Sequence, residues 1–252
     1  MYNRAVRFIK DPMGVVSDRK TKVNCIILLK CFLGLLVVKG IGNVLKLGIL
    51  FCSNPIANSL KDTWVMDFVM NSSPQSYSVI DTIILGIVIY PIIEELIFRA
   101  PLVLNKIWLS FSMALLYLTF FSGTSLNYIV SRCDWGNLQD VKSVAINILI
   151  SIAIYYVLSQ LYSRYAVMFG SFYAKYYNWL LYVFCSLFAL GHLFNVDITY
   201  YSLMLAPVFV LPYFFSALFF SYVRLKYGLL HSILIHIMTN GLLIGFFKIF
   251  EK

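Results

Sequence analysis

Long apolar runs separated by short polar stretches dominate the chain from residue 24 onward. A helix needs about 20 mostly apolar residues to cross the hydrocarbon core of a bilayer. The runs of about this length lie at residues 24–51, 78–98, 107–127, 143–162, 177–195, 200–223 and 228–250. The pattern therefore predicts an all-α fold, a polytopic transmembrane helical bundle of about seven to eight spans.

The same pattern divides the chain into three parts. Residues 1–22 hold six Lys and Arg against two Asp and are predicted to form a basic cytoplasmic arm. Residues 23–76 are predicted to form a first transmembrane helix and an extramembrane loop, with a partly interfacial position as the alternative because lysines interrupt the helix. Residues 77–250 hold the remaining apolar runs and form the predicted core.

The composition supports a membrane protein and argues against a nucleic-acid partner. The chain is 61% hydrophobic and 12% charged, with a mean hydropathy of +0.83, whereas soluble domains are about 25% charged. The net charge of +9 is spread over segment ends and is not gathered on one face. Lys and Arg in alternate loops favour a cytoplasmic N-terminus. We therefore expect an integral membrane protein with the lipid bilayer as its partner.

Two adjacent glutamates, Glu94 and Glu95, lie within the second apolar run. A carboxylate at membrane depth is costly unless it is paired or lines a wet cavity. Glu95 and Arg99 are one helical turn apart, so they are predicted to neutralise each other. Glu94 is offset from Glu95 by about 100° on a helix and is left available for chemistry. The alternative is that all three lie at a helix end among the lipid headgroups.

Two later runs add histidines to apolar surroundings. His192 follows Phe188 by one turn, and Asn240 follows His236 by one turn. Taken singly, each histidine is a core residue or part of a packing hydrogen bond. Taken together with Glu94, they offer a set of roles for hydrolysing an acyl bond without a covalent nucleophile. A glutamate beside a histidine can take a proton from water, and a second histidine with an asparagine can stabilise an oxyanion.

These three blocks resemble the CPBP family of intramembrane glutamate proteases, which includes the CAAX proteases and bacteriocin-processing (Abi) proteins. The family patterns are Glu-Glu-x-x-x-Arg, Phe-x-x-x-His and His-x-x-x-Asn or Asp. The residues that match them are Glu94, Glu95, Arg99, Phe188, His192, His236 and Asn240. The resemblance covers about residues 78–245, and each block alone is a weak signal. One departure is Ala100, where the family commonly has glycine after the arginine.

The resemblance implies that residues 77–250 are a CPBP-like transmembrane protease core with an intramembrane catalytic cavity. In that core Glu94 and His192 would activate a water, and His236 with Asn240 would bind the oxyanion. Glu95, Arg99 and Phe188 would support the site. The implied protein is a metal-independent intramembrane endopeptidase without a cofactor, in the plasma (inner) membrane of a bacterium. Its implied substrate is a membrane-associated peptide or a lipid-modified protein.

Three alternatives stay open at this point. The chain could be a non-catalytic membrane binding protein or a bacteriocin-immunity protein, because function lives in a site and not in a fold. It could be a zinc metalloprotease with Glu94, His192 and His236 as ligands, although no HExxH motif is present and Asn240 would then lack a role. A transporter is disfavoured because the chain has no inverted repeat. The substrate, and whether it is prenylated, stays open.

Overall fold

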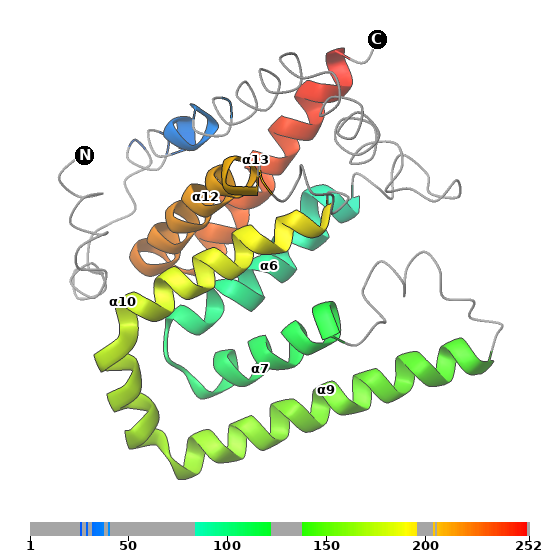
Figure 1. The fold of residues 1–252 in the computed structure, drawn as a ribbon, viewed down its shortest axis with the longest axis vertical. Coiled ribbons are helices and arrows are strands. Elements are labelled where there is room, and N and C mark those ends of the chain that lie inside the picture. Colours follow the sequence, from blue (N-terminus) through cyan, green and yellow to red (C-terminus); the bar gives the residue numbers. More distant parts are fainter. Residues whose placement is uncertain are drawn as a thin grey trace. The chain divides into compact units, whose positions relative to one another are not determined.

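The computed structural model describes residues 26, 29, 32–37, 40, 84–121, 138–195, 204 and 206–250. These residues form helices and turns without any strand, as Figure 1 shows, so the all-α prediction is confirmed for them. The predicted N-terminal arm at residues 1–22 and the loop preceding residue 77 lie outside the described residues.

The chain forms two compact units. The central unit is Ile92–Tyr177, and the two-part unit combines Met1–Pro91 with Asn178–Lys252. In chain order the elements are η2 (Leu85–Ile89), α6 (Tyr90–Phe98), η3 (Ala100–Leu102), α7 (Lys106–Leu116), η4 (Tyr117–Phe121), α9 (Leu138–Arg164), α10 (Ala166–Gly191), η5 (His192–Asn195), α12 (Ala206–Tyr227) and α13 (Leu229–Phe250). Here η2 and η4 are π-helices, and η3 and η5 are 3₁₀ helices.

The central unit is organised around α7 and α9, which lie side by side (Figure 1). The side chain of Asn105 starts α7, because its Oδ1 accepts the backbone N–H of Ile107 at 2.9 Å. Such a cap satisfies one of the N–H groups that a helix start leaves without a partner. The buried residues of α7 are small: Ser110, Ser112 and Ala114. Small residues allow neighbouring helices to approach closely.

The two-part unit pairs α12 with α13 across one glycine. Gly228 has φ of +104°, a backbone conformation that side-chain-bearing residues rarely adopt, so glycine suits this tight connection. Five buried residues of this unit form one hydrophobic cluster: Phe32, Leu35, Phe220, Val223 and Ile235. The short helical stretch at residues 32–37, within the first predicted span, therefore packs against α12 and α13.

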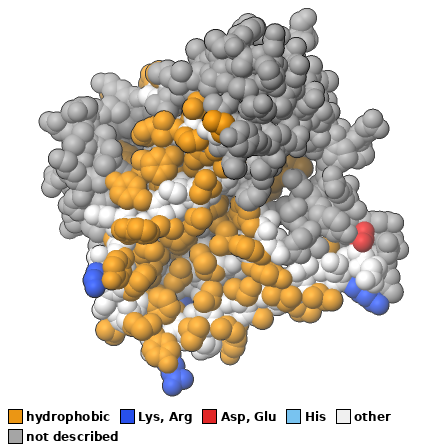
Figure 2. Space-filling view, viewed as in Figure 1, with side chains coloured by type: hydrophobic (Ala, Val, Ile, Leu, Met, Phe, Trp, Pro, Cys, Tyr) orange, Lys and Arg blue, Asp and Glu red, His pale blue; other side chains and the backbone are white. Residues whose placement is uncertain are grey.

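Helix α13 buries polar side chains and exposes apolar ones. Its buried residues include Ser232, His236 and Thr239, whereas Leu230, Leu234 and Met238 are each about half exposed or more. Water-soluble helices show the opposite arrangement. Hydrophobic side chains likewise cover much of the described part of the face drawn in Figure 2, whereas large exposed apolar patches are rare on soluble monomers.

Two of the described helices are long and apolar enough to cross a membrane, over Gln139–Arg164 and Ala206–Tyr227. They contain most of the runs predicted at 143–162 and 200–223. Helix α10 runs from Ala166 to Gly191, and it has a kink at Tyr176, next to the start that the sequence predicts at residue 177. The residues from Ala166 to Lys175, which the predicted apolar runs leave out, are helical, and no proline interrupts them. The backbone of α10 leaves helical values at Tyr176, with φ of −113° and ψ of 16°.

Candidate functional site

The glutamate motif lies at the C-terminal end of α6, in the central unit. The Nε of Arg99 is 3.5 Å from Oε1 of Glu95, and the two side chains are 1% and 0% exposed. The structure thus contains the ion pair that the four-residue spacing predicts. Glu94, which directly precedes Glu95, is only partly buried. The two adjacent carboxylates therefore occupy different environments, as their offset around the helix predicts.

Two tyrosines of α10 hold the turn that follows this motif. The hydroxyl of Tyr173 donates to the carbonyl oxygen of Pro101 at 2.8 Å, and that of Tyr177 donates to Leu102 at 3.1 Å. Both tyrosines are buried, and the kink of α10 at Tyr176 lies between them. Burial raises the pKa of Tyr173 to about 12, with a smaller contribution from Tyr162. Neither tyrosine is predicted from the sequence, where their four-residue spacing is the only signal.

We expect Tyr173→Phe to lower the free energy of unfolding by roughly 1–3 kcal/mol, because the carbonyl of Pro101 would lose a buried hydrogen bond. The raised pKa also makes this contribution pH-dependent. The unfolded chain has a tyrosine pKa of about 10, so the contribution is complete below pH 10 and declines as the pH rises towards about 12. Thermal unfolding in detergent between pH 7 and pH 11 measures both effects (these values span the ordinary tyrosine pKa of about 10).

The control is Tyr176→Phe, because the Tyr176 side chain is 41% exposed and the variant keeps its ring. Tyr176→Phe should leave stability within about 0.5 kcal/mol of wild type. Equal losses in the two variants would contradict a specific role for the Tyr173 hydroxyl.

The histidine motifs lie in the two-part unit, where Phe188 contacts both motif histidines. Phe188 and His192 have ring centroids 4.7 Å apart, and Phe188 and His236 have centroids 6.1 Å apart in an edge-to-face arrangement. His192 begins η5 directly after α10, and its Nδ1 lies 2.9 Å from the carbonyl oxygen of Phe188. Because a carbonyl only accepts hydrogen bonds, Nδ1 carries the hydrogen. In the neutral ring Nε2 is therefore the basic nitrogen.

Helix α12 adds two aromatic residues that the sequence motifs do not include. Tyr213 stacks on His192 with centroids 4.0 Å apart and an interplanar angle of 26°. Phe220 stacks on His236 at 4.2 Å and 22°. Each ring contacts the next in the order Tyr213, His192, Phe188, His236 and Phe220. Residue spacing could not single out Tyr213 and Phe220, because the chain has 18 tyrosines and 21 phenylalanines.

Asn240 lies one turn after His236 on α13, and its side chain reaches the π-helix η2. Its Nδ2 donates to the carbonyl oxygen of Gly86 at 3.3 Å. The neighbouring Gly241 lies against Ile87, since a Cβ at position 241 would lie 3.5 Å from Cγ2 of that residue. These contacts join α13 to η2 within the two-part unit.

The predicted site residues thus fall into two groups, one in each unit. The central unit holds Glu94, Glu95 and Arg99, and the two-part unit holds Phe188, His192, His236 and Asn240. Within the part of the chain that the structure describes, no three His, Cys, Asp or Glu side chains gather as potential metal ligands.

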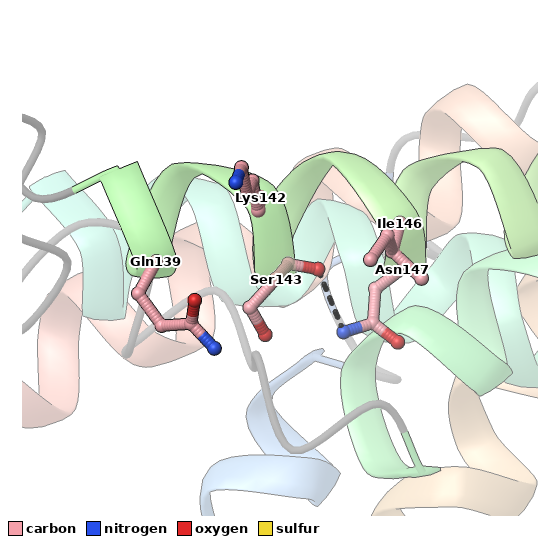
Figure 3. Close-up of a pocket in the computed structure, with 5 residues that line it drawn as sticks. All are labelled: Gln139, Lys142, Ser143, Ile146 and Asn147. Atoms are coloured by element: carbon pink, nitrogen blue, oxygen red, sulfur yellow. Dashed lines mark hydrogen bonds between the residues drawn. The ribbon is translucent and has the colours of Figure 1, made fainter.

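A hollow of about 290 Å³ lies beside the N-terminal part of α9. It is lined by one face of that helix, with Gln139, Lys142, Ser143, Ile146 and Asn147 (Figure 3). Asn147 is held from two sides, because its Nδ2 donates to the carbonyl oxygen of Ser143 at 3.0 Å and its Oδ1 accepts the hydroxyl of Tyr117 at 2.9 Å. None of the predicted site residues lines this hollow.

The described residues are all-α and include two helices long and apolar enough to cross a membrane. Among the motif residues, Glu95, Arg99, Phe188 and His236 are buried. Comparison of the chain with protein-family models, with curated proteins and with solved structures found no match. The family resemblance therefore rests on the residues of the three motifs alone.

Proposed function

We propose that the chain is an integral membrane protein with about seven to eight spans, in a bacterial inner membrane with its N-terminus in the cytoplasm. The apolar runs of the sequence and the exposed apolar side chains of α13 support this proposal. In lipid, polar side chains are expected to face the bundle interior. Ser232, His236 and Thr239 have that distribution.

Within this membrane protein we propose an intramembrane endopeptidase that uses a water activated by Glu94 and His192. The observation that carries the proposal is the packing of both motif histidines against Phe188. Three residues from two sequence motifs, far apart in the chain, share one ring cluster. The buried Glu95–Arg99 ion pair of the first motif is a second observation that supports the proposal. Burying two charges carries a large desolvation penalty, so a purely structural helix would be expected to have apolar residues at these positions.

The proposed reaction is hydrolysis of a peptide bond. Glu94 or His192 takes a proton from water while the water oxygen forms a bond to the carbonyl carbon. The carbonyl π electrons move to its oxygen, and His236 and Asn240 donate hydrogen bonds to that oxyanion. As the oxyanion collapses, the C–N bond breaks and the proton passes to the leaving amine. The products are a carboxylic acid and an amine, and no covalent enzyme intermediate forms.

The substrate class follows from where the motif residues lie. All three motifs fall within apolar runs, so the bond that is cut must belong to a chain that reaches the membrane. A membrane-associated peptide or a lipid-modified protein meets this requirement. Exposed aromatic side chains such as Phe172 and Trp179 are also typical of residues that contact lipid and its interface.

A chelation experiment separates this proposal from its alternatives. The purified full-length protein in detergent is incubated with a pool of membrane-derived peptides, with and without a strong chelator, and products are identified by mass spectrometry. We expect cleavage that the chelator leaves unchanged. Loss of cleavage with chelator and its return with zinc would instead support a metalloprotease. Peptide retention without any cleavage would support a binding or immunity protein.

A further inference from the structure

Helix α12 presents two aromatic rings on one face, two turns apart, to the two motif histidines. Tyr213 and Phe220 differ by seven positions, which returns to nearly the same side of a helix. Each is the face-stacked partner of one histidine, at centroid distances of 4.0 and 4.2 Å. All four residues belong to the two-part unit. A single helix outside the three motifs therefore contacts both histidine rings.

Each histidine has a second contact that complements its stacked ring. The Nδ1 of His192 hydrogen-bonds the carbonyl oxygen of Phe188 at 2.9 Å, and His236 meets the Phe188 ring edge to face. A stacked ring restricts the plane of the imidazole, and the second contact restricts its rotation within that plane. Both features are needed to aim a particular ring nitrogen, because imidazole nitrogens lie on the ring perimeter.

We propose that Tyr213 and Phe220 are positioning residues that set the ring planes of His192 and His236. The catalytic consequence rests on the proposed peptidase function, whereas the ring geometry does not. Tyr213 has an additional role in this proposal, since the negative face of its ring attracts the imidazolium that forms when His192 accepts a proton. A histidine that loses its stacked partner can still accept a proton, but the orientation of its ring plane is no longer fixed.

Tyr213 offers the cleaner test of the two. Phe220 is fully buried and also belongs to the hydrophobic core with Phe32 and Val223, so its removal would disturb packing as well as His236. Tyr213 is only partly buried. Tyr213→Phe keeps the stacked ring and removes the hydroxyl, whereas Tyr213→Leu removes the ring. Phe215→Leu is the matched control, because Phe215 lies on the same helix and is 46% exposed.

The experiment records the ring-proton resonances of histidine in the full-length protein, labelled with ¹³C-histidine and held in detergent micelles. A stacked aromatic ring shifts these resonances upfield. We expect Tyr213→Leu to remove that shift for His192 and leave His236 unchanged. Tyr213→Phe and Phe215→Leu should both keep the wild-type pattern. In wild type, nuclear Overhauser contacts between the rings of His192 and Tyr213 are expected, and they test the stack without any substitution.

Kinetics on a cleaved peptide test the catalytic part. Tyr213→Leu should lower kcat by roughly ten- to a hundredfold with little change in KM, because small misplacements of a catalytic group cost rate. Absence of the nuclear Overhauser contacts, or an unchanged His192 spectrum in Tyr213→Leu, would overturn the inference. So would equal spectral effects of Tyr213→Phe and Tyr213→Leu. The expected spectra in a protein that cleaves nothing would uphold the ring geometry and count against the peptidase proposal alone.

Discussion

Replacing Arg99 with alanine is expected to lower the free energy of unfolding by about 3–5 kcal/mol. The reason is that Glu95 is 0% exposed and pairs with Arg99 at 3.5 Å, so the variant would leave a buried carboxylate without its counter-ion. The long side chain of Arg99 is also one of the largest that is fully buried, and its loss would open space around the turn. Thermal and denaturant unfolding of the purified protein in detergent measures the change.

A double variant separates charge from packing. Glu95→Leu combined with Arg99→Met removes both charges and keeps side chains of roughly similar volume. Replacing a buried ion pair by apolar residues of similar volume is often neutral or stabilising. The double variant should therefore recover most of the stability that Arg99→Ala loses. If the double variant were as unstable as Arg99→Ala, the charge argument for this pair would be wrong.

The second large effect concerns catalysis at Glu94. Glu94→Gln should lower kcat for peptide cleavage by at least about a hundredfold, because a positioned general base typically contributes 10²–10⁴-fold. Glutamine keeps the shape and hydrogen-bonding capacity of the side chain and removes its ability to accept a proton. Glu94 is only partly buried, so the unfolding temperature should change little. Initial rates over a range of peptide concentrations separate kcat from KM.

Asp140→Asn is the matched control for this experiment. Asp140 lies in the first turn of α9 and is also partly buried, yet it belongs to none of the three motifs. It should retain wild-type kcat, since the proposed chemistry assigns it no role. A full rate in Glu94→Gln, or equal losses in both variants, would remove Glu94 from the mechanism.

The helices could be predicted from the sequence more reliably than their ends. Apolar runs of about 20 residues are visible by composition, so the helices at 138–164 and 206–227 were expected near 143–162 and 200–223. The helical residues before the kink at Tyr176 are not predicted, because Arg164 and Lys175 bound an interval between two apolar runs. Charge marks where a segment meets water or headgroups, and a helix can continue beyond that point when no proline stops it.

In the candidate site, contacts within one helical turn were predictable from the sequence, and contacts between helices were not. The Glu95–Arg99 pair was predictable because both residues lie within one helical turn. The stacking of Tyr213 on His192 was not, because it joins two helices and depends on how they pack. Single-sequence periodicity indicates which face of a helix is apolar and says nothing of its partner. The same limit applies to the bond from Tyr173 to Pro101, which joins residues 72 positions apart.

The most direct test of the account compares wild type with His236→Ala in the cleavage of membrane peptides. His236 lies in the two-part unit and Glu94 in the central unit, so parallel losses in His236→Ala and Glu94→Gln would assign residues of both units to one reaction. Mass spectrometry of the peptides identifies every new terminus that the purified protein creates. The account predicts new termini with wild type and none with folded His236→Ala. Identical termini from both proteins, or none from folded wild type, would contradict it.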